Sequence, residues 1–260
     1  MKIAFLSDVH GNMPALQEAL KLIEESGAYL TVFLGDAVHY GPSPEAAVKL
    51  LMESDVECLQ GNCDRAAARG RKNTGENYDN SHWRNIASDF FQWTCQALSK
   101  ESKKWLKSLP EELRFQLDKT TILCVHGIPG RQNGMLPANA AAEIYDGILT
   151  RAGADIVVCG MTHTPAVIRR PSGLILNPGS VGGGTLPAGG TFMILSFPDK
   201  GFPEVETVQF SYSTEELRKQ YTKAGRGELF LRCAELGRDQ RGNWHTDKPE
   251  WRQKWADFSL

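Results

Sequence analysis

The sequence has no long apolar run and no strong excess of charge of one sign. Between Met1 and Ser7 it offers one lysine and only four apolar residues, too few for a signal peptide, and no later run approaches a bilayer span. We therefore expect a cytoplasmic protein with no membrane partner. The 29 Lys and Arg residues against 31 Asp and Glu give a formal charge of -2, so no basic stripe argues for nucleic acid as a partner.

The sequence also has few cysteine residues, and their spacing matches no metal-binding or redox motif. None of the six Cys residues belongs to a CxxC pair. Cys124 and Cys159 fall inside predicted strands, where Cys usually acts as a small hydrophobic side chain. The sequence therefore predicts neither disulfides nor a structural zinc finger.

A short apolar run opens the chain and leads directly into polar side chains. Residues 2–6 are too few for a helix and bulky enough for a buried strand. The run stops at Ser7 and is followed by Asp8 and His10, two metal-ligand types, with Gly11 behind them. We expect this strand to place Asp8 and His10 in a cleft.

The same pattern recurs along the chain. Predicted strands at 31–34, 56–60, 121–125 and 155–159 each end near a polar residue beside a Gly. In open α/β sheets ligands bind beyond the carboxyl ends of the strands, so such ends converge on one crevice. Any one Asp or His after a strand is more often a turn or cap residue. Together they predict one site, formed by Asp8, His10, Asp36, Asn62, His126 and His163.

Helical spacing between the first strands predicts a parallel sheet. Apolar residues at helical intervals mark a helix over 14–25, with Asn12 as cap and Gly27 as stop, and a second helix that Ser43 caps and that extends to Ser54. The resulting β-α-β-α-β order favours parallel strands. Two apolar runs flanking Asp118 resemble a hairpin, so the second half is predicted to be antiparallel or mixed.

The remaining stretches have weaker signals. Residues 63–80 are small and charged and predict a loop near the ligand, before a helix over 81–98. The Gly-rich stretch 179–190 lacks the Lys-Ser/Thr of a phosphate-binding P-loop, so we expect a loop between strands. The polar tail begins with a capping box at Ser213 and predicts helices laid on the domain or on a partner; its anchors would be Trp244, Trp251 and Trp255.

Six short blocks give the chain a family resemblance. They are DVHGN at 8–12, GDAVHYGP at 35–42, GNCD at 61–64, HG at 126–127, GMTH at 160–163 and NPGSVG at 177–182. In this order they resemble the calcineurin-like metallophosphoesterases, and specifically the small bacterial and archaeal phosphodiesterase branch. The resemblance covers residues 1 to about 197. It implies an α/β fold, a four-layer sandwich of two mixed β-sheets flanked by α-helices. We expect a metallophosphoesterase domain over 1–210 and a helical C-terminal extension over 211–260.

The resemblance also implies two divalent metal ions. Its motif assigns Asp8, His10, Asp36 and His163 to the first ion, and Asp36 bridges to a second ion with Asn62 and His126. Two cations about 3.5–4 Å apart lower the pKa of a shared water and stabilise both attacking and leaving oxygens. Mixed Asp, Asn and His ligands suit Mn or Fe best, with Zn as an alternative.

Two residues depart from the family pattern. Met161 stands where the family usually has an imidazole, so the second ion is expected to bind weakly. Cys63 stands where many members have the His that helps protonate the leaving oxygen, although some small phosphodiesterases also carry Cys there. His39 or Asp64 is a candidate acid in its place. Arg65 and Arg131 are candidates for phosphate contacts, although an exposed Arg is more often only solvated.

The function predicted from these features is metal-dependent hydrolysis of a phosphodiester or a nucleotide-like phosphoester by a metal-activated hydroxide. The predicted catalytic residues are Asp36, Asn62, Cys63, Asp64 and His39. The partner is a small phosphoester substrate, and the C-terminal extension is a candidate homo-oligomer contact. The alternative is a binding or scaffold protein that keeps the fold with little catalysis, which Met161, Cys63 and the Trp-bearing tail favour.

Overall fold

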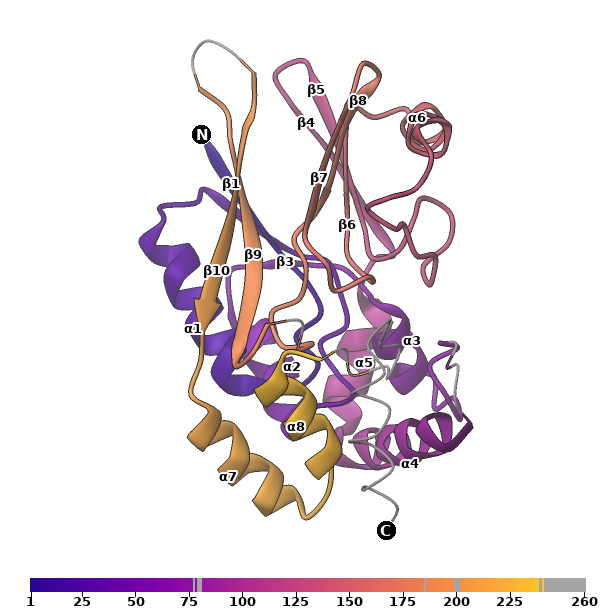
Figure 1. Ribbon diagram of the computed structural model, residues 1–260, viewed down its shortest axis with the longest axis vertical. Helices are drawn as coiled ribbons and strands as arrows, with labels where there is room; N and C mark the ends of the chain where they lie inside the picture. Colours follow the sequence, from indigo (N-terminus) through magenta and orange to yellow (C-terminus); the bar gives the residue numbers. More distant parts are fainter. Residues whose placement is uncertain (77, 79–80, 185, 199–201, 239, 241–260) are drawn as a thin grey trace, which may run out of the picture.

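The computed structural model describes residues 1–76, 78, 81–184, 186–198, 202–238 and 240. Within these residues the chain forms two five-stranded sheets that lie against each other, with helices on their outer sides (Figure 1). This arrangement confirms the predicted α/β four-layer sandwich.

The first sheet has the order β10-β9-β1-β2-β3 and collects strands from both ends of the chain. It consists of β1 (Lys2–Leu6), β2 (Leu30–Phe33), β3 (Glu57–Cys58), β9 (Gly189–Ser196) and β10 (Glu204–Ser211). The β1, β2 and β3 strands are parallel, whereas β9 runs antiparallel to β1 and β10. The helices α1 (Met13–Glu25) and α2 (Pro44–Glu53) make the two parallel crossovers. The predicted β-α-β-α-β order is confirmed.

The second sheet has the order β4-β5-β6-β8-β7 and is mixed, as predicted. Its strands are β4 (Glu112–Leu117), β5 (Thr120–Val125), β6 (Ile156–Cys159), β7 (Ala166–Arg170) and β8 (Gly173–Asn177), and α6 (Ala142–Ala152) joins β5 to β6. The β4–β5 hairpin was expected. The edge strand β7 was not, because its alternating half-buried and exposed residues give a weak apolar signal.

Three layers of apolar side chains separate the four layers of backbone. Between the sheets, Phe5 and Val32 of the first sheet share one cluster with Val158 and Leu176 of the second. Cys124 packs in the same cluster as a small hydrophobic side chain, as predicted. The outer face of the first sheet packs on helices α1 and α2, and that of the second packs on α6.

Helix α3 (Asn62–Ala68) corrects the predicted loop over 63–80. Gly61 at the N-cap is extended, and the Asp64 carboxylate accepts its N–H at 3.0 Å, so a carboxylate stabilises the first turn. The spacing of Gly61 and Asp64 before three alanines is the signal that sequence reasoning missed. Helix α4 (Ser81–Ala97) follows as expected, and α5 (Lys100–Ser108) comes directly after it.

Of the N-caps predicted for the first two helices, the structure confirms one and corrects the other. Asn12 caps α1, since its Oδ1 accepts the Ala15 N–H at 3.2 Å. Ser43 precedes α2 as predicted, but its hydroxyl makes no cap bond and donates instead to Gln220 Oε1 at 2.8 Å. Its side chain therefore ties α2 to the tail, which is a correction to the predicted cap.

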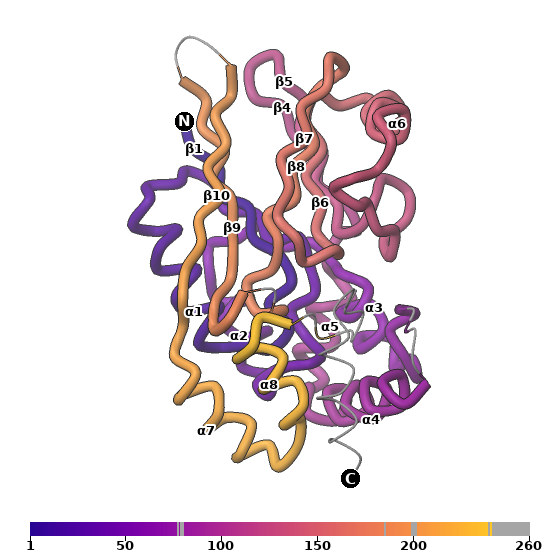
Figure 2. Tube along the Cα trace, viewed as in Figure 1, coloured from indigo at the N-terminus to yellow at the C-terminus, as the bar shows by residue number. Residues whose placement is uncertain are grey.

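The tail forms α7 (Thr214–Ala224) and α8 (Glu228–Leu236), which pack on each other, and α7 also packs on α1 (Figure 2). Ser213 Oγ accepts the Glu216 N–H at 3.2 Å, as expected of the cap. Leu217, Tyr221 and Phe230 are buried in the cluster that also covers the first sheet. The three predicted Trp anchors lie outside the described residues, and the boundary at 210 stays a prediction.

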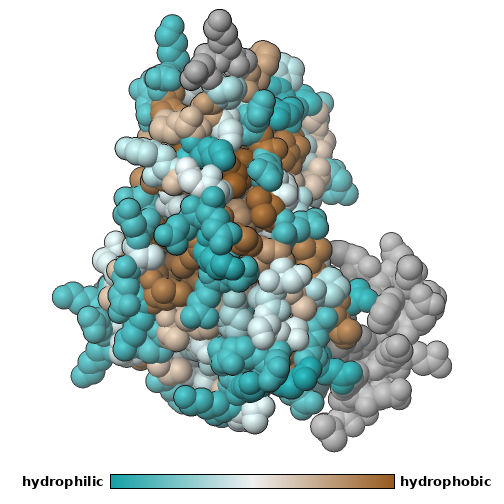
Figure 3. All heavy atoms as spheres, turned by 90° about the vertical axis from the view of Figure 1, so that its left-hand side faces the viewer, coloured by the Kyte–Doolittle hydropathy of each residue, from teal (hydrophilic) through white to brown (hydrophobic). Residues whose placement is uncertain are grey.

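Among the described residues, every helix is too short or too polar to span a membrane. The face of the molecule that carries β10 and α1 mixes hydrophilic side chains with apolar ones near its middle (Figure 3). The predicted oligomer contact of the extension stays a prediction.

Candidate metal centre

The predicted ligands follow strand ends of both sheets. Asp8 and His10 follow β1, Asp36 follows β2, and Asn62 follows β3 in the first sheet. From the second sheet, His126 follows β5 and His163 follows β6. All six are buried, with at most 5% of the surface of any of these residues exposed. Because the strands that carry them are parallel within each sheet, these ends meet at one rim.

Four of these residues have an unusual backbone conformation. Asp8, His10, Asp36 and His163 all have positive φ angles, between 49° and 61°. The left-handed region disfavours residues with a Cβ, and each such residue costs on the order of 1 kcal/mol. Strained conformations of this kind cluster where side-chain direction serves function. The turn after each strand therefore aims these side chains inward at an energetic cost.

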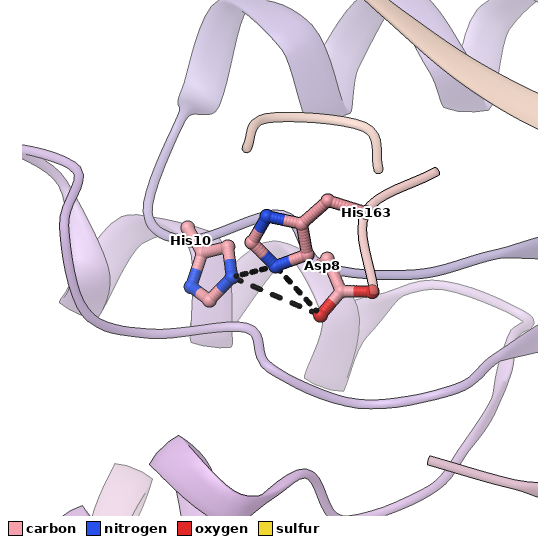
Figure 4. Close-up of side chains that lie close together, drawn as sticks. All are labelled: Asp8, His10 and His163. Atoms are coloured by element: carbon pink, nitrogen blue, oxygen red, sulfur yellow. Dashed lines mark hydrogen bonds and ion pairs between the residues drawn. The ribbon is translucent and has the colours of Figure 1, made fainter. Parts of the chain in front are cut away.

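Asp8, His10 and His163 form one compact group (Figure 4). His163 Nε2 lies 3.0 Å from His10 Nε2 and 3.3 Å from Asp8 Oδ1. His10 Nε2 lies 3.8 Å from the same carboxylate oxygen. Three potential ligand atoms from two sheets thus face a common point.

A second group forms beside the first. His126 Nε2 lies 3.5 Å from Asp36 Oδ2 and 3.0 Å from Asn62 Oδ1. The other Asp36 oxygen accepts the Cys63 N–H at 2.8 Å, which fixes the carboxylate. Asp8, Asp36 and His126 offer ligand atoms within 4.8 Å of one another, so the two groups adjoin.

The backbone contacts of two imidazoles fix the direction of their lone pairs. His10 Nδ1 lies 3.2 Å from the Val38 carbonyl oxygen, and His126 Nδ1 lies 3.0 Å from that of Leu34. A carbonyl oxygen only accepts, so each Nδ1 carries the proton. Each Nε2 then faces carboxylate, amide or imidazole acceptor atoms, and this contact is favourable only when a proton or a cation lies between the two atoms. This is the orientation of imidazole ligands to metals.

The charges of the cluster favour a cation. Burial raises the pKa of Asp36, but the His126 imidazole outweighs it and holds that pKa below its ordinary value. Burial would lower the pKa of His126, yet the Asp36 carboxylate raises it to about 10. Burial and His163 lower the pKa of His10 to about 4. Buried carboxylates beside imidazole nitrogens, at which a bound cation would replace the proton, are a donor set that suits divalent first-row metals.

Asp64 lies behind the cluster and holds its backbone. Its Oδ2 accepts the N–H groups of Asp36 at 2.8 Å and Gly61 at 3.0 Å, and its Oδ1 accepts those of Ala37 at 2.9 Å and Val38 at 3.3 Å. Burial and the Asp36 charge raise the pKa of Asp64 to about 7, against the effect of these N–H groups. Both oxygens are used by backbone, which favours a positioning role over the predicted role as acid.

His39 is packed among aromatic rings. Its ring stacks on Tyr40 at 3.7 Å between centroids and meets Phe91 edge-on at 5.2 Å. Neither ring nitrogen has a hydrogen-bond partner in the described structure, and burial holds the pKa of His39 well below its ordinary value. A neutral, enclosed imidazole does not favour the predicted role as proton donor.

Cys63 adjoins a cluster that the sequence did not predict. Its Sγ belongs with His10 and Asp36 to a third group of ligand atoms, within 4.8 Å of one another. On its other side, Cys63 Sγ lies 3.9 Å from Glu76 Oε2, which accepts hydroxyl groups of Tyr40, Thr74 and Tyr78. Glu76 lies in a polar loop and had no motif to mark it.

The block at 177–182 supports the cluster through its backbone. Asn177 Nδ2 donates to the Gly160 carbonyl at 2.8 Å and to Thr162 Oγ1 at 2.9 Å, which fixes the turn that carries Met161 and His163. Ser180 Oγ donates to the Asp8 carbonyl at 2.7 Å. Met161 is buried, and its N–H donates to Asp8 Oδ2 at 3.2 Å.

The two candidate arginines lie on the surface side of the site. Arg65 Nη1 pairs with Glu111 at 3.2 Å, which occupies its guanidinium. Arg131 is exposed and closes a tight turn with Ile128. No contact of either with the cluster is seen in the described residues.

Two packed mixed sheets with buried carboxylates and imidazoles at a shared rim define the class of metallophosphoesterases. Residues 1–200 match the family model described as calcineurin-like phosphoesterase superfamily domain. The chain belongs to this family, and it is by class a hydrolase of phosphoric esters.

Individual relatives agree with this assignment. The chain is 28% identical over 204 residues to phosphodiesterase YfcE of Escherichia coli, covering 73% of this chain and 83% of that protein. A metallophosphoesterase of Sphaerobacter thermophilus has a similar structure, with TM-score 0.69, 25% identity and coverage of 91% of this chain and 100% of that one. Hypothetical protein PH1004 of Pyrococcus horikoshii shares the fold, with TM-score 0.76, 19% identity and coverage of 92% and 99%.

Proposed function

We propose that this protein hydrolyses a phosphodiester, or a nucleotide-like phosphoester with a good leaving group, with the help of two divalent metal ions. The observation that carries the proposal is the convergence of Asp8, His10 and His163 with Asp36 and His126 at one buried rim. The similarity to the phosphodiesterase YfcE supports the substrate class.

In this proposal the side chains divide between two ions. Asp8, His10 and His163 hold one, Asn62 and His126 hold the other, and Asp36 serves both. When bound, such a pair supplies Lewis acidity and an activated water at neutral pH. Mn or Fe fits the mixed oxygen and imidazole donors, with Zn as an alternative.

The protein's own residues prepare the site for that chemistry. The carbonyls of Val38 and Leu34 fix the tautomers of His10 and His126, so their Nε2 atoms face inward without rearrangement. Asp64 holds the backbone that carries Asp36. Cys63 has a thiol whose pKa burial and the Asp36 charge raise well above its ordinary value, so it faces the site as a neutral group.

The proposal is tested by assaying bis-p-nitrophenyl phosphate and p-nitrophenyl phosphate with added Mn²⁺. We expect turnover that depends on the metal and is lost in Asp36→Asn. The matched control is Asp146→Asn, which removes a carboxylate paired with Arg170 on the surface. No turnover above the Asp36→Asn background would favour the scaffold alternative instead.

A further inference from the structure

The turn that follows β2 lies directly against His10, a candidate metal ligand. Its residues His39 and Tyr40 both have positive φ angles, 84° and 56°. The next residue, Gly41, leaves no room for a side chain, since an added Cβ would lie 1.9 Å from the His10 carbonyl oxygen. The Tyr40 ring also meets the His10 imidazole nearly edge-on, at 5.0 Å between centroids. The conformation of this turn therefore sets the position of His10.

Helix α7 of the tail holds this turn in place. Tyr221 is buried, and its hydroxyl donates to the Tyr40 carbonyl oxygen at 2.9 Å. The neighbouring Gln220 accepts the Ser43 hydroxyl at 2.8 Å, just past the turn. Two successive residues with a Cβ in the left-handed region are unfavourable by themselves, and such a conformation persists only when its surroundings impose it. These two bonds from α7 are part of what imposes it.

Helix α8 supports the other side of the same ligand group through three glycines at 182–184. The first donates its N–H to the Asp8 carbonyl oxygen at 3.0 Å. The second lies against the His163 imidazole, since an added Cβ would lie 2.6 Å from Nδ1. An added Cβ on the third would lie 3.2 Å from the carbonyl oxygen of Cys233 in α8. The glycines thus lie between α8 and two of the candidate ligands, at distances too short for side chains.

We propose that the tail helices α7 and α8 form the outer support of the first metal ion, and that Tyr221 is a positioning residue for His10. The contacts above lead to the ligand group of Figure 4, which the proposed function assigns to one ion, so the role of the tail rests on that function. Both helices lie beyond residues 1–200, the part of the chain that the family model matches. The tail thereby adds to the family domain a means of fixing one metal ligand.

The test is calorimetric titration of the metal-free, full-length protein with Mn²⁺. Removing a group that orients a metal ligand lowers metal affinity by about 10–100-fold. Because Tyr221 acts on His10 through the backbone, Tyr221→Phe is expected to show the lower end of this range, a rise of about tenfold in the Mn²⁺ dissociation constant. The visible absorption spectrum of the Co²⁺-loaded variant should differ from that of the wild type, since the geometry at His10 changes.

Tyr145→Phe is the matched control. Tyr145 is also buried, and its hydroxyl donates to a carbonyl oxygen, that of Pro137, at 2.8 Å, but its bonds stay within the segment that leads into α6. The variant should lose a similar amount of free energy of unfolding and leave the Mn²⁺ dissociation constant and the Co²⁺ spectrum unchanged. Should Tyr221→Phe fail to fold, Ser43→Ala removes only the link to Gln220 and should raise the dissociation constant as well.

Turnover is measured separately from binding. With bis-p-nitrophenyl phosphate, Tyr221→Phe should need about tenfold more Mn²⁺ for its half-maximal rate and keep kcat at saturating Mn²⁺ near that of the wild type. A wild type that binds Mn²⁺ without turnover would contradict the proposed function, and the titration would still decide the role of Tyr221. An unchanged dissociation constant in the folded variant, an equal rise in Tyr145→Phe, or a wild type that binds no Mn²⁺ would overturn the inference.

Discussion

Replacing Asp64 by Asn separates a structural carboxylate from a catalytic acid. The Asp64 carboxylate accepts four backbone N–H groups, two at each oxygen. The single amide oxygen of Asn serves two of them, and its NH2 group faces the other two donors. The variant keeps the size of the side chain and removes only its charge and half its acceptors.

The expected cost follows from those contacts. A hydrogen bond to a charged group contributes about 1.5–3 kcal/mol, and a buried donor left without a partner costs a similar amount. Loss of two such bonds at this fully buried site should therefore lower the free energy of unfolding by about 3–5 kcal/mol. Loss of these hydrogen bonds also weakens the support of the backbone that positions Asp36, so the metal content of the variant should fall as well.

Urea denaturation at pH 8, with metal content measured on the same samples, checks this prediction. Asp146→Asn, at a surface ion pair, is the control and should change stability little. The reasoning is refuted if Asp64→Asn keeps wild-type stability and metal content while its rate collapses for poor leaving groups. That outcome would restore Asp64 as the proton donor.

Three further predictions concern the metals and the buried histidine. Mn²⁺ at a hundred times its dissociation constant should stabilise the protein by about 2.7 kcal/mol and raise Tm by roughly 5–10 °C in calorimetry. The shift should vanish in Asp36→Asn, and an equal shift there would place the ion elsewhere. Met161→His should raise the metal content measured by elemental analysis; unchanged stoichiometry would mean that another group already completes the second site. His39→Phe should raise the free energy of unfolding by about 1–2 kcal/mol, because it removes buried ring nitrogens that lack partners. Since burial lowers the folded-state pKa of His39, the wild type should also lose stability as pH falls below about 6.5, and denaturation series from pH 8 to 5 should show a smaller loss in His39→Phe.

The sequence by itself determined the fold class and the set of candidate ligands. Short apolar runs that end in Asp, Asn or His beside Gly are local signals, and parallel strands bring their carboxyl ends to one rim. Asp8, His10, Asp36, Asn62, His126 and His163 accordingly lie together. The helix at Asn62–Ala68 was also within reach, since its first-turn carboxylate is local.

Only the tertiary structure decided what the neighbouring residues do. The position of Asp64 next to Cys63 predicts a proton donor to the leaving group. In the structure, however, both of its carboxylate oxygens accept backbone N–H groups, which lie up to 28 positions away in the sequence. His39 looks like a titrating group, but aromatic rings from α4 and its own turn enclose it. Glu76 gives no signal in the chain, because its donors Tyr40, Thr74 and Tyr78 meet only when two loops pack on each other. Hydrogen bonds and desolvation depend on distances between residues far apart in sequence, and folding alone sets those distances.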